Sequence, residues 1–180
     1  MKYLVFSDLH GSYTALEKIE EKFISHQCDK FICLGDLLYH GPRNNLPEGY
    51  NPKLVVELLQ KYLNQFIWIQ GNCDAEVDMM VMKKRFYKQK KLHIKSKNII
   101  LTHGHHLSRF DTNNNIKENS IVLYGHYHVF DISIIDKVTY INIGSTSIPK
   151  DQNKQYGILD DNSIKIYNLD NDELIGDYRL

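Results

Sequence analysis

Five short polar clusters, each placed directly after an apolar run, constrain the fold of this chain more than any other feature. The apolar runs have the length and composition of buried β-strands: 3–6, 31–34, 66–69, 99–101 and 121–124. The clusters that follow them are Asp8-Leu9-His10, Gly35-Asp36, Gly71-Asn72, His103-Gly104-His105 and Gly125-His126-Tyr127-His128. Strands that stop just before such groups place them together at one sheet edge.

This edge would offer oxygen and nitrogen ligands and almost no sulfur, which suits two divalent cations. Asp36 can bridge two cations because a carboxylate has two oxygens, whereas an imidazole cannot bridge in this way. Each motif alone is weak, since Gly-Asp and Gly-Asn are ordinary turn dipeptides. Their combination in this order predicts a dinuclear metal site. Its candidate ligands are Asp8, His10, Asp36, Asn72, His103, His126 and His128.

The composition narrows the class of protein. A chain of 180 residues with 42% hydrophobic residues fits one globular domain, 1–180, with an ordinary core. Its net charge of zero provides no overall field that would attract nucleic acid or an anionic membrane. We expect no membrane span and no signal peptide, because the apolar stretches are too short. Three cysteines without a spacing pattern argue against disulfides and favour a cytoplasmic location.

The two halves of the chain differ in their periodicity. Strands at 3–7, 30–34 and 66–70 alternate with helices that begin after Ser12, span 52–64 and span 75–84. From residue 86 onward the pattern predicts short strands at 92–95, 98–102, 121–124, 131–135, 138–143, 155–160 and 163–169. Parallel βαβ units followed by a β-rich half predict an α/β fold with two facing mixed sheets and helices outside.

The order of the motifs resembles that of the calcineurin-like metallophosphoesterases, and in particular the bacterial YfcE-type phosphodiesterases. The resemblance extends over essentially the whole chain and includes 35–44, 46–50, 71–78, 101–105 and 142–150. It implies a four-layer αββα sandwich with a dinuclear site at one edge. By this likeness Asp8, His10, Asp36 and His128 would hold the first metal ion, and Asp36, Asn72, His103 and His126 the second. The resemblance favours Mn²⁺, while the ligand types also suit Zn²⁺, Fe²⁺, Ni²⁺ or Co²⁺.

Such a site predicts hydrolysis of a small phosphodiester. Two cations about 3.5–4 Å apart would lower the pKa of a shared water and hold the resulting hydroxide facing phosphorus. Asp36, Asn72, Cys73 and His103 would then be the catalytic residues. Many relatives carry a histidine after Gly-Asn that protonates the leaving alcohol, and here this position is Cys73. A thiol is a weak hydrogen-bond donor, so we expect diesters to be preferred over monoesters; the alternative is that Cys73 only packs.

Further polar residues follow the ligands in sequence. His40, Arg43 and Asn44 come after Asp36, and His105 follows His103; these four are the candidate substrate-binding residues. Arg43 would clamp a phosphate oxygen, or alternatively it orders its loop or a subunit contact.

A nuclease, a phosphoprotein phosphatase or a non-catalytic interaction scaffold are the alternative functions for the same fold. A nuclease or a phosphoprotein phosphatase would need an extra domain or a basic groove, and a non-catalytic scaffold would normally lose metal ligands. The basic run 82–91 is more typical of a solvated edge than of a nucleic-acid site. The methionines at 79, 80 and 82 fit either the core or a contact in a homo-oligomer.

Overall fold

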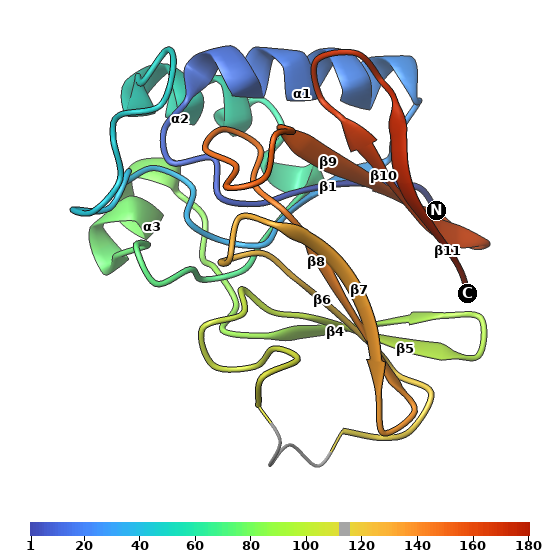
Figure 1. Ribbon diagram of the computed structural model, residues 1–180. Helices are drawn as coiled ribbons and strands as arrows, with labels where there is room; N and C mark the ends of the chain where they lie inside the picture. The colour runs from blue at the N-terminus through green and yellow to red at the C-terminus, as the bar shows by residue number, and fades with distance from the viewer. Residues whose placement is uncertain (112–115) are drawn as a thin grey trace.

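The structure, a computed structural model, describes residues 1–111 and 116–180, and in these residues eleven strands form two sheets (Figure 1). The first sheet has the order β11-β10-β9-β1-β2-β3. Its strands are β1 (Tyr3–Phe6), β2 (Lys30–Cys33), β3 (Phe66–Trp68), β9 (Gln155–Leu159), β10 (Ser163–Asn168) and β11 (Leu174–Arg179). The second sheet has the order β4-β5-β6-β8-β7. Its strands are β4 (Lys90–Ile94), β5 (Lys97–Leu101), β6 (Ile121–Tyr124), β7 (Phe130–Ile135) and β8 (Val138–Ile143).

Both sheets are mixed, and their parallel parts position the polar clusters. Strands β1, β2 and β3 are parallel, while β9 pairs antiparallel with β1. In the second sheet β5, β6 and β8 are parallel, and antiparallel β4 and β7 form the edges. The polar clusters therefore leave the carboxyl ends of parallel neighbours in each sheet.

Three helices, α1 (Tyr13–Ser25), α2 (Pro52–Gln60) and α3 (Glu76–Met82), contribute to the apolar cluster on the outer face of the first sheet (Figure 1). Helices α1 and α2 begin as predicted, because Ser12 and Asn51 cap them by accepting main-chain hydrogen bonds at 3.2 Å. Helix α2 ends earlier than predicted, and a separate 3₁₀ turn, Leu63–Gln65, leads into β3.

The main core lies between the two sheets. Val5 and Ile32 from the first sheet meet Ile99, Leu123 and Ile141 from the second, and all five side chains are fully buried. The outer face of the second sheet carries a smaller cluster covered by coil residues. The predicted fold class is therefore confirmed, with two facing mixed sheets. In the described residues the helices lie on one side and coil lies on the other.

The second half of the chain, in its described residues, contains one strand more than the sequence predicted. Strand β11 was not predicted; it extends the first sheet beyond β10, and its Gly176 lies so close to the Phe130 ring that a Cβ would clash. The basic run leads into β4, which forms a sheet edge as expected.

Met82 is buried in the core, whereas Met80 is 77% exposed. In the described ranges, no helix has the length and apolar character needed to span a bilayer.

Candidate metal centre

The predicted ligands meet where the carboxyl ends of the two sheets face each other. Five of them are at most 5% exposed: Asp8, His10, Asp36, His103 and His128. Asn72 and His126 lie nearer the surface. The structure thus brings side chains from both sheets together, as the strand ends predicted.

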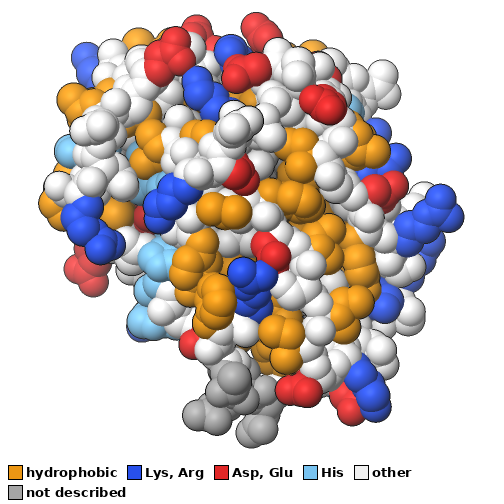
Figure 2. All heavy atoms as spheres, viewed as in Figure 1, with side chains coloured by type: hydrophobic (Ala, Val, Ile, Leu, Met, Phe, Trp, Pro, Cys, Tyr) orange, Lys and Arg blue, Asp and Glu red, His pale blue; other side chains and the backbone are white. Residues whose placement is uncertain are grey.

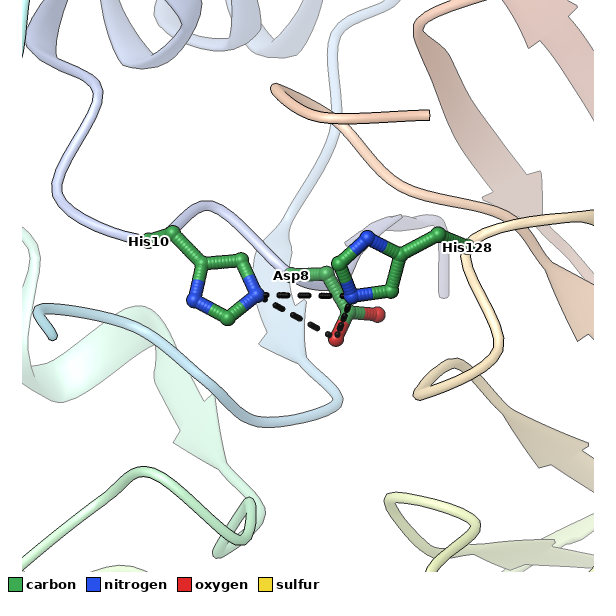
Figure 3. Close-up of side chains that lie close together, drawn as sticks. All are labelled: Asp8, His10 and His128. Atoms are coloured by element: carbon green, nitrogen blue, oxygen red, sulfur yellow. Dashed lines mark hydrogen bonds and ion pairs between the residues drawn. The ribbon is translucent and has the colours of Figure 1, made fainter. Parts of the chain in front are cut away.

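One group forms around Asp8 (Figure 3). Asp8 Oδ1 lies 3.2 Å from His128 Nε2 and 3.8 Å from His10 Nε2, and the two Nε2 atoms are 3.4 Å apart. These three side chains can offer three ligand atoms to one ion. Because His10 and Asp8 follow β1 while His128 follows β6, the group joins the two sheets.

The other ring nitrogen of His10 and of His128, Nδ1, already makes a hydrogen bond to the main chain. His10 Nδ1 lies 2.8 Å from the carbonyl oxygen of Tyr39, and His128 Nδ1 lies 2.8 Å from that of Ile148. A carbonyl only accepts, so each Nδ1 carries the proton and each Nε2 is left as a lone pair when the ring is neutral. Asp8 Oδ1 is also buried and has no hydrogen-bond partner among the described residues. Three acceptors therefore converge on one point, where one proton cannot satisfy all of them and a cation can.

A second group forms around Asp36. Its Oδ2 atom lies 3.4 Å from His103 Nε2 and 3.7 Å from His10 Nε2, so Asp36 stands between the histidines of the two groups. His103 Nε2 is also 3.0 Å from Asn72 Oδ1, and its Nδ1 donates to the carbonyl of Leu34 at 2.8 Å. This is the position that a bridging carboxylate would need.

His126 completes the set from the turn after β6. Its ring centroid lies 5.0 Å from that of His103, and its main-chain N–H donates to Asp8 Oδ2 at 2.9 Å. His126 thus borders both groups, although its ring nitrogens are not part of the tight clusters around Asp8 and Asp36.

The electrostatics of the centre favour a bound cation. Burial alone would raise the pKa of Asp8, but the His128 contact and the charges of nearby histidines hold it well below its usual range. The pKa of Asp36 is likewise lowered, against burial, mainly by His103. Burial also disfavours the charged form of His103, yet Asp36 and Asp8 raise its pKa to about 9. Both carboxylates are therefore ionised at neutral pH.

Five of the seven predicted ligands have a left-handed backbone. The φ angles are 52° at Asp8, 48° at His10, 55° at Asp36, 68° at His126 and 61° at His128. This conformation costs an L-residue about 1–2 kcal/mol, although Asp and His tolerate it better than most residue types. Such strain concentrates at functional sites, where surrounding structure imposes it.

Several residues outside the ligand set hold these strained turns. Asp74 accepts hydrogen bonds from the N–H groups of Gly71 at 2.7 Å, Leu37 at 2.9 Å and Asp36 at 3.0 Å. Asp74 thus binds the main chain of two ligand-bearing loops. Burial raises its pKa to about 6 despite these hydrogen bonds.

The loop after β8 supports Asp8 in the same way. The hydroxyls of Ser145 and Ser147 donate to the main-chain carbonyl of Asp8 at 2.9 Å and 3.0 Å. Asn142 donates to the carbonyl of Gly125 at 2.8 Å and so fixes the turn that carries His126. Sequence reasoning assigned these residues no role, although they lie within the segment 142–150 that carries part of the family resemblance.

A pocket of about 300 Å³ opens over the centre. Its lining residues are His10, Asp36, Gly41, Pro42, Arg43, Asn44, Asn72, Cys73, His126, His128 and Lys150. Arg43 and Asn44 thus stand where a substrate could touch them, and Lys150 is a pocket residue that sequence reasoning missed. Figure 2 shows histidine side chains gathered at the left of the view, with basic side chains beside them.

The other two candidate substrate-binding residues lie outside this pocket. His40 packs its ring against Tyr39 and Tyr50, and its carbonyl accepts a hydrogen bond from the Asn44 amide at 2.8 Å. His105 stacks near His106 and His126, and burial with the neighbouring histidine charges lowers its pKa to about 4.

Cys73 borders the metal centre directly. Its Sγ atom lies within 4.8 Å of ligand atoms of His10 and Asp36, and its N–H donates to Asp36 Oδ1 at 2.8 Å. Burial, and then the charge of Asp36, raise the pKa of the thiol to about 12. Cys28 and Cys33 are buried elsewhere, and all three cysteines are free.

The sequence of most of the chain matches a known protein family. The sequence model of the calcineurin-like phosphoesterase superfamily domain matches residues 1–163. The chain belongs to this superfamily. The expected resemblance is thereby confirmed, and the buried Asp and His groups lie at the metal centre of a phosphoesterase fold.

Individual relatives agree with this assignment. The chain is 36% identical to "Phosphodiesterase YfcE" of Escherichia coli K12 over 179 residues, which is 97% of this chain and 96% of the relative. A solved structure of the E. coli phosphoesterase YfcE superposes with a TM-score of 0.93 at 34% identity, covering 99% and 98% of the two chains. Zinc-bound Vps29 of Entamoeba histolytica, at 15% identity and a TM-score of 0.60, covers 100% and 98% and shares the fold.

Proposed function

We propose that this chain is a metal-dependent phosphodiesterase that hydrolyses a small phosphodiester and acts weakly on phosphomonoesters. The proposal rests on three hydrogen-bond acceptors that converge on one point: Asp8 Oδ1 and the Nε2 atoms of His10 and His128. The carboxylate of Asp36 lies between this group and His103. The similarity to a phosphodiesterase over nearly the full chain supports the same activity.

The donor set fits two divalent ions. Asp8, His10, Asp36 and His128 would hold the first ion, and Asp36, Asn72, His103 and His126 the second. Four imidazoles with carboxylates and one amide suit Mn²⁺, Zn²⁺, Fe²⁺, Ni²⁺ or Co²⁺ better than Ca²⁺, and we propose Mn²⁺. When bound, such ions polarise phosphate oxygens and make a water more acidic, which is the chemistry that ester hydrolysis needs.

The chain's own residues would then position the substrate. Arg43 presents a guanidinium on the pocket wall, where it can bind a non-bridging phosphate oxygen with two parallel hydrogen bonds. Asn44 stands beside it and is held by the carbonyl of His40. The pocket of about 300 Å³ favours a small substrate over a polymer or a folded phosphoprotein.

Cys73 would set the preference between ester classes. It lines the pocket beside Asp36 with a weakly donating thiol, so the leaving group receives little help from a protein acid. Esters with good leaving groups would react best, and diesters would be preferred over monoesters.

A metal add-back screen tests the proposal. Chelator-stripped protein would receive Mn²⁺, Zn²⁺, Mg²⁺ or Ni²⁺ and be assayed with paired aryl phosphodiester and phosphomonoester substrates. We expect diester hydrolysis to return with Mn²⁺ and to exceed monoester hydrolysis. Asp36→Asn should lose this activity, whereas Asp160→Asn in the exposed turn before β10 should keep it. Equal hydrolysis with and without metal ions would contradict the proposal.

A further inference from the structure

Lys150 is the one cationic residue of the pocket to which neither the sequence reasoning nor the proposed reaction gives a role. It lies in the loop between β8 and β9, and its main-chain N–H donates to the carbonyl of His128 at 2.8 Å. The imidazole of His128 in turn donates to the carbonyl of Ile148. The backbone of Lys150 is thereby tied to a predicted metal ligand, and its charge acts on His128.

The charge of Lys150 has no ion-pair partner in the described part of the chain, whereas some other basic residues of the chain are paired. Lys18, Lys22 and Arg109 each contact a carboxylate at 2.6 Å. The carboxylate next to Lys150 in sequence is already used, because Asp151 accepts hydrogen bonds from the Phe130 N–H at 2.8 Å and from the Gln155 amide at 3.0 Å. Lys150 therefore presents an uncompensated positive charge to the pocket.

Arg43, which also lines the pocket, is the second such charge. It too lacks an ion-pair partner among the residues described, and it lies in the loop between β2 and α2. A contact of 2.9 Å between Lys154 and Glu48 joins this loop to the loop of Lys150. The pocket thus has a cation on each of two connected loops, and among the described residues that line it Asp36 is the only carboxylate.

These charges exceed what a simple phosphodiester requires. A phosphodiester carries one negative charge, which the metal ions and Arg43 would already bind under the proposed function. We propose that Lys150 binds a second anionic group of the substrate, so that the preferred substrates are phosphodiesters that carry an additional phosphate. This inference rests on the proposed function and adds a substrate class to it.

Two matched substrates test this role. One is the p-nitrophenyl ester of thymidine 5′-phosphate, and the other is the same ester with a 3′-phosphate. Both release p-nitrophenol from the same diester, so they differ only in the second phosphate. We expect the 3′-phosphorylated ester to have a kcat/KM about fivefold higher or more, chiefly through KM, and the advantage to shrink as ionic strength rises.

Variants of Lys150 identify the residue responsible. Lys150→Gln should bring the ratio of the two kcat/KM values close to one, and Lys150→Arg should keep most of it because the charge is retained. Lys53→Gln, which removes an exposed lysine on α2, should leave the ratio as in the unaltered chain. Thermal midpoints would show that each variant is folded.

The outcomes separate the two proposals. Hydrolysis of both esters with a ratio near one in the unaltered chain, or a ratio that Lys150→Gln does not change, overturns the role of Lys150 and leaves the phosphodiesterase proposal standing. Failure to hydrolyse either ester with any divalent metal ion overturns the proposed function and this inference with it.

Discussion

Asp74 accepts a hydrogen bond from the main-chain N–H of Asp36 at 3.0 Å. Asp74 is not one of the predicted metal ligands, yet it holds in place the ligand, Asp36, that lies between His10 and His103. The same side chain binds the N–H groups of Leu37 and Gly71. It therefore fixes the loops after β2 and β3 relative to each other. Gly71 packs so closely against Asp36 that a Cβ there would overlap the carboxylate.

Replacement of Asp74 with asparagine should weaken both the fold and the metal centre. An amide offers one acceptor oxygen in place of two and turns N–H groups toward main-chain donors. We expect a loss of about 1–3 kcal/mol in the free energy of unfolding. We also expect metal affinity to fall about 10–100-fold, as when a supporting partner of a ligand is removed. Chemical denaturation and metal titration of the stripped protein measure these two effects.

Asp160→Asn is the matched control for this variant. Asp160 also accepts two main-chain hydrogen bonds, from Asn162 and Ser163, but it lies in the turn between β9 and β10. Both bonds go to Oδ1, whose place the asparagine oxygen can take, so Asp160→Asn should change neither stability nor metal affinity much. If both variants changed metal affinity equally, Asp74 would have no special role at the centre.

The stability of chelator-treated protein should depend on pH through His103. Its pKa is raised from 6.5 to about 9 by Asp36 and Asp8. Folding therefore favours the protonated ring, and this contribution is fully present below pH 6.5 and is lost as the pH rises through about 9. The thermal midpoint should fall over this window.

The variant His103→Gln isolates this effect, since glutamine cannot take up the proton. Its thermal midpoint should start lower and change less between neutral pH and about pH 9. Asp74, with a pKa raised to about 6, titrates mostly below this window and does not produce the same slope. An equal slope in both proteins would show that another group is responsible.

The ligands could be predicted from the sequence because strand ends fix where their side chains emerge. Once Asp8 and Asp36 follow the parallel neighbours β1 and β2, the geometry of that sheet brings them to one edge without further information. The tight convergence of His10 with His128, 118 positions apart, follows from the facing of the two sheets. Local sequence does not specify how the two sheets face each other. Here the order of the motifs indicated that arrangement.

Other features could not be predicted because they depend on tertiary contacts. The left-handed turn at Asp36 is imposed by its neighbours, and the sequence shows only the preceding glycine. The role of Asp74 became visible once three main-chain donors surrounded it. Lys150 is an ordinary loop lysine until the structure places it on the pocket wall. Strand β11 has a weak alternation, and its pairing with β10 stabilises it.

Removal of the Arg43 side chain should reduce catalytic efficiency on a phosphodiester. A hydrogen bond to a charged group contributes about 1.5–3 kcal/mol, so Arg43→Ala should lower kcat/KM by about 10–100-fold. Steady-state kinetics with an aryl diester and saturating metal ion would show whether the loss lies in KM or kcat. Arg85→Ala, at an exposed site beyond α3, serves as the control. Unchanged KM and kcat in Arg43→Ala would leave Arg43 with only a loop-ordering or contact role.

Replacement of Cys73 with histidine should shift the reaction toward phosphomonoesters. The side chain at this position lies beside Asp36 and His10 on the pocket wall, within reach of a leaving group bound over the centre. An imidazole titrates near neutral pH, whereas burial raises the pKa of the thiol to about 12. General acids typically contribute about 10²–10⁴ in rate, so even partial success should raise the monoester-to-diester rate ratio about tenfold.

The control for this shift is Cys73→Ala, which removes the thiol without supplying an acid. It should leave the rate ratio near that of the unaltered chain, because the thiol donates little to the leaving group. The gain in Cys73→His should be largest for alkyl monoesters, whose leaving groups need a proton most, and should decline as the pH rises above the imidazole pKa. If the ratio stays the same in Cys73→His while metal binding is retained, residue 73 does not determine the ester class, and its place beside Asp36 serves packing alone.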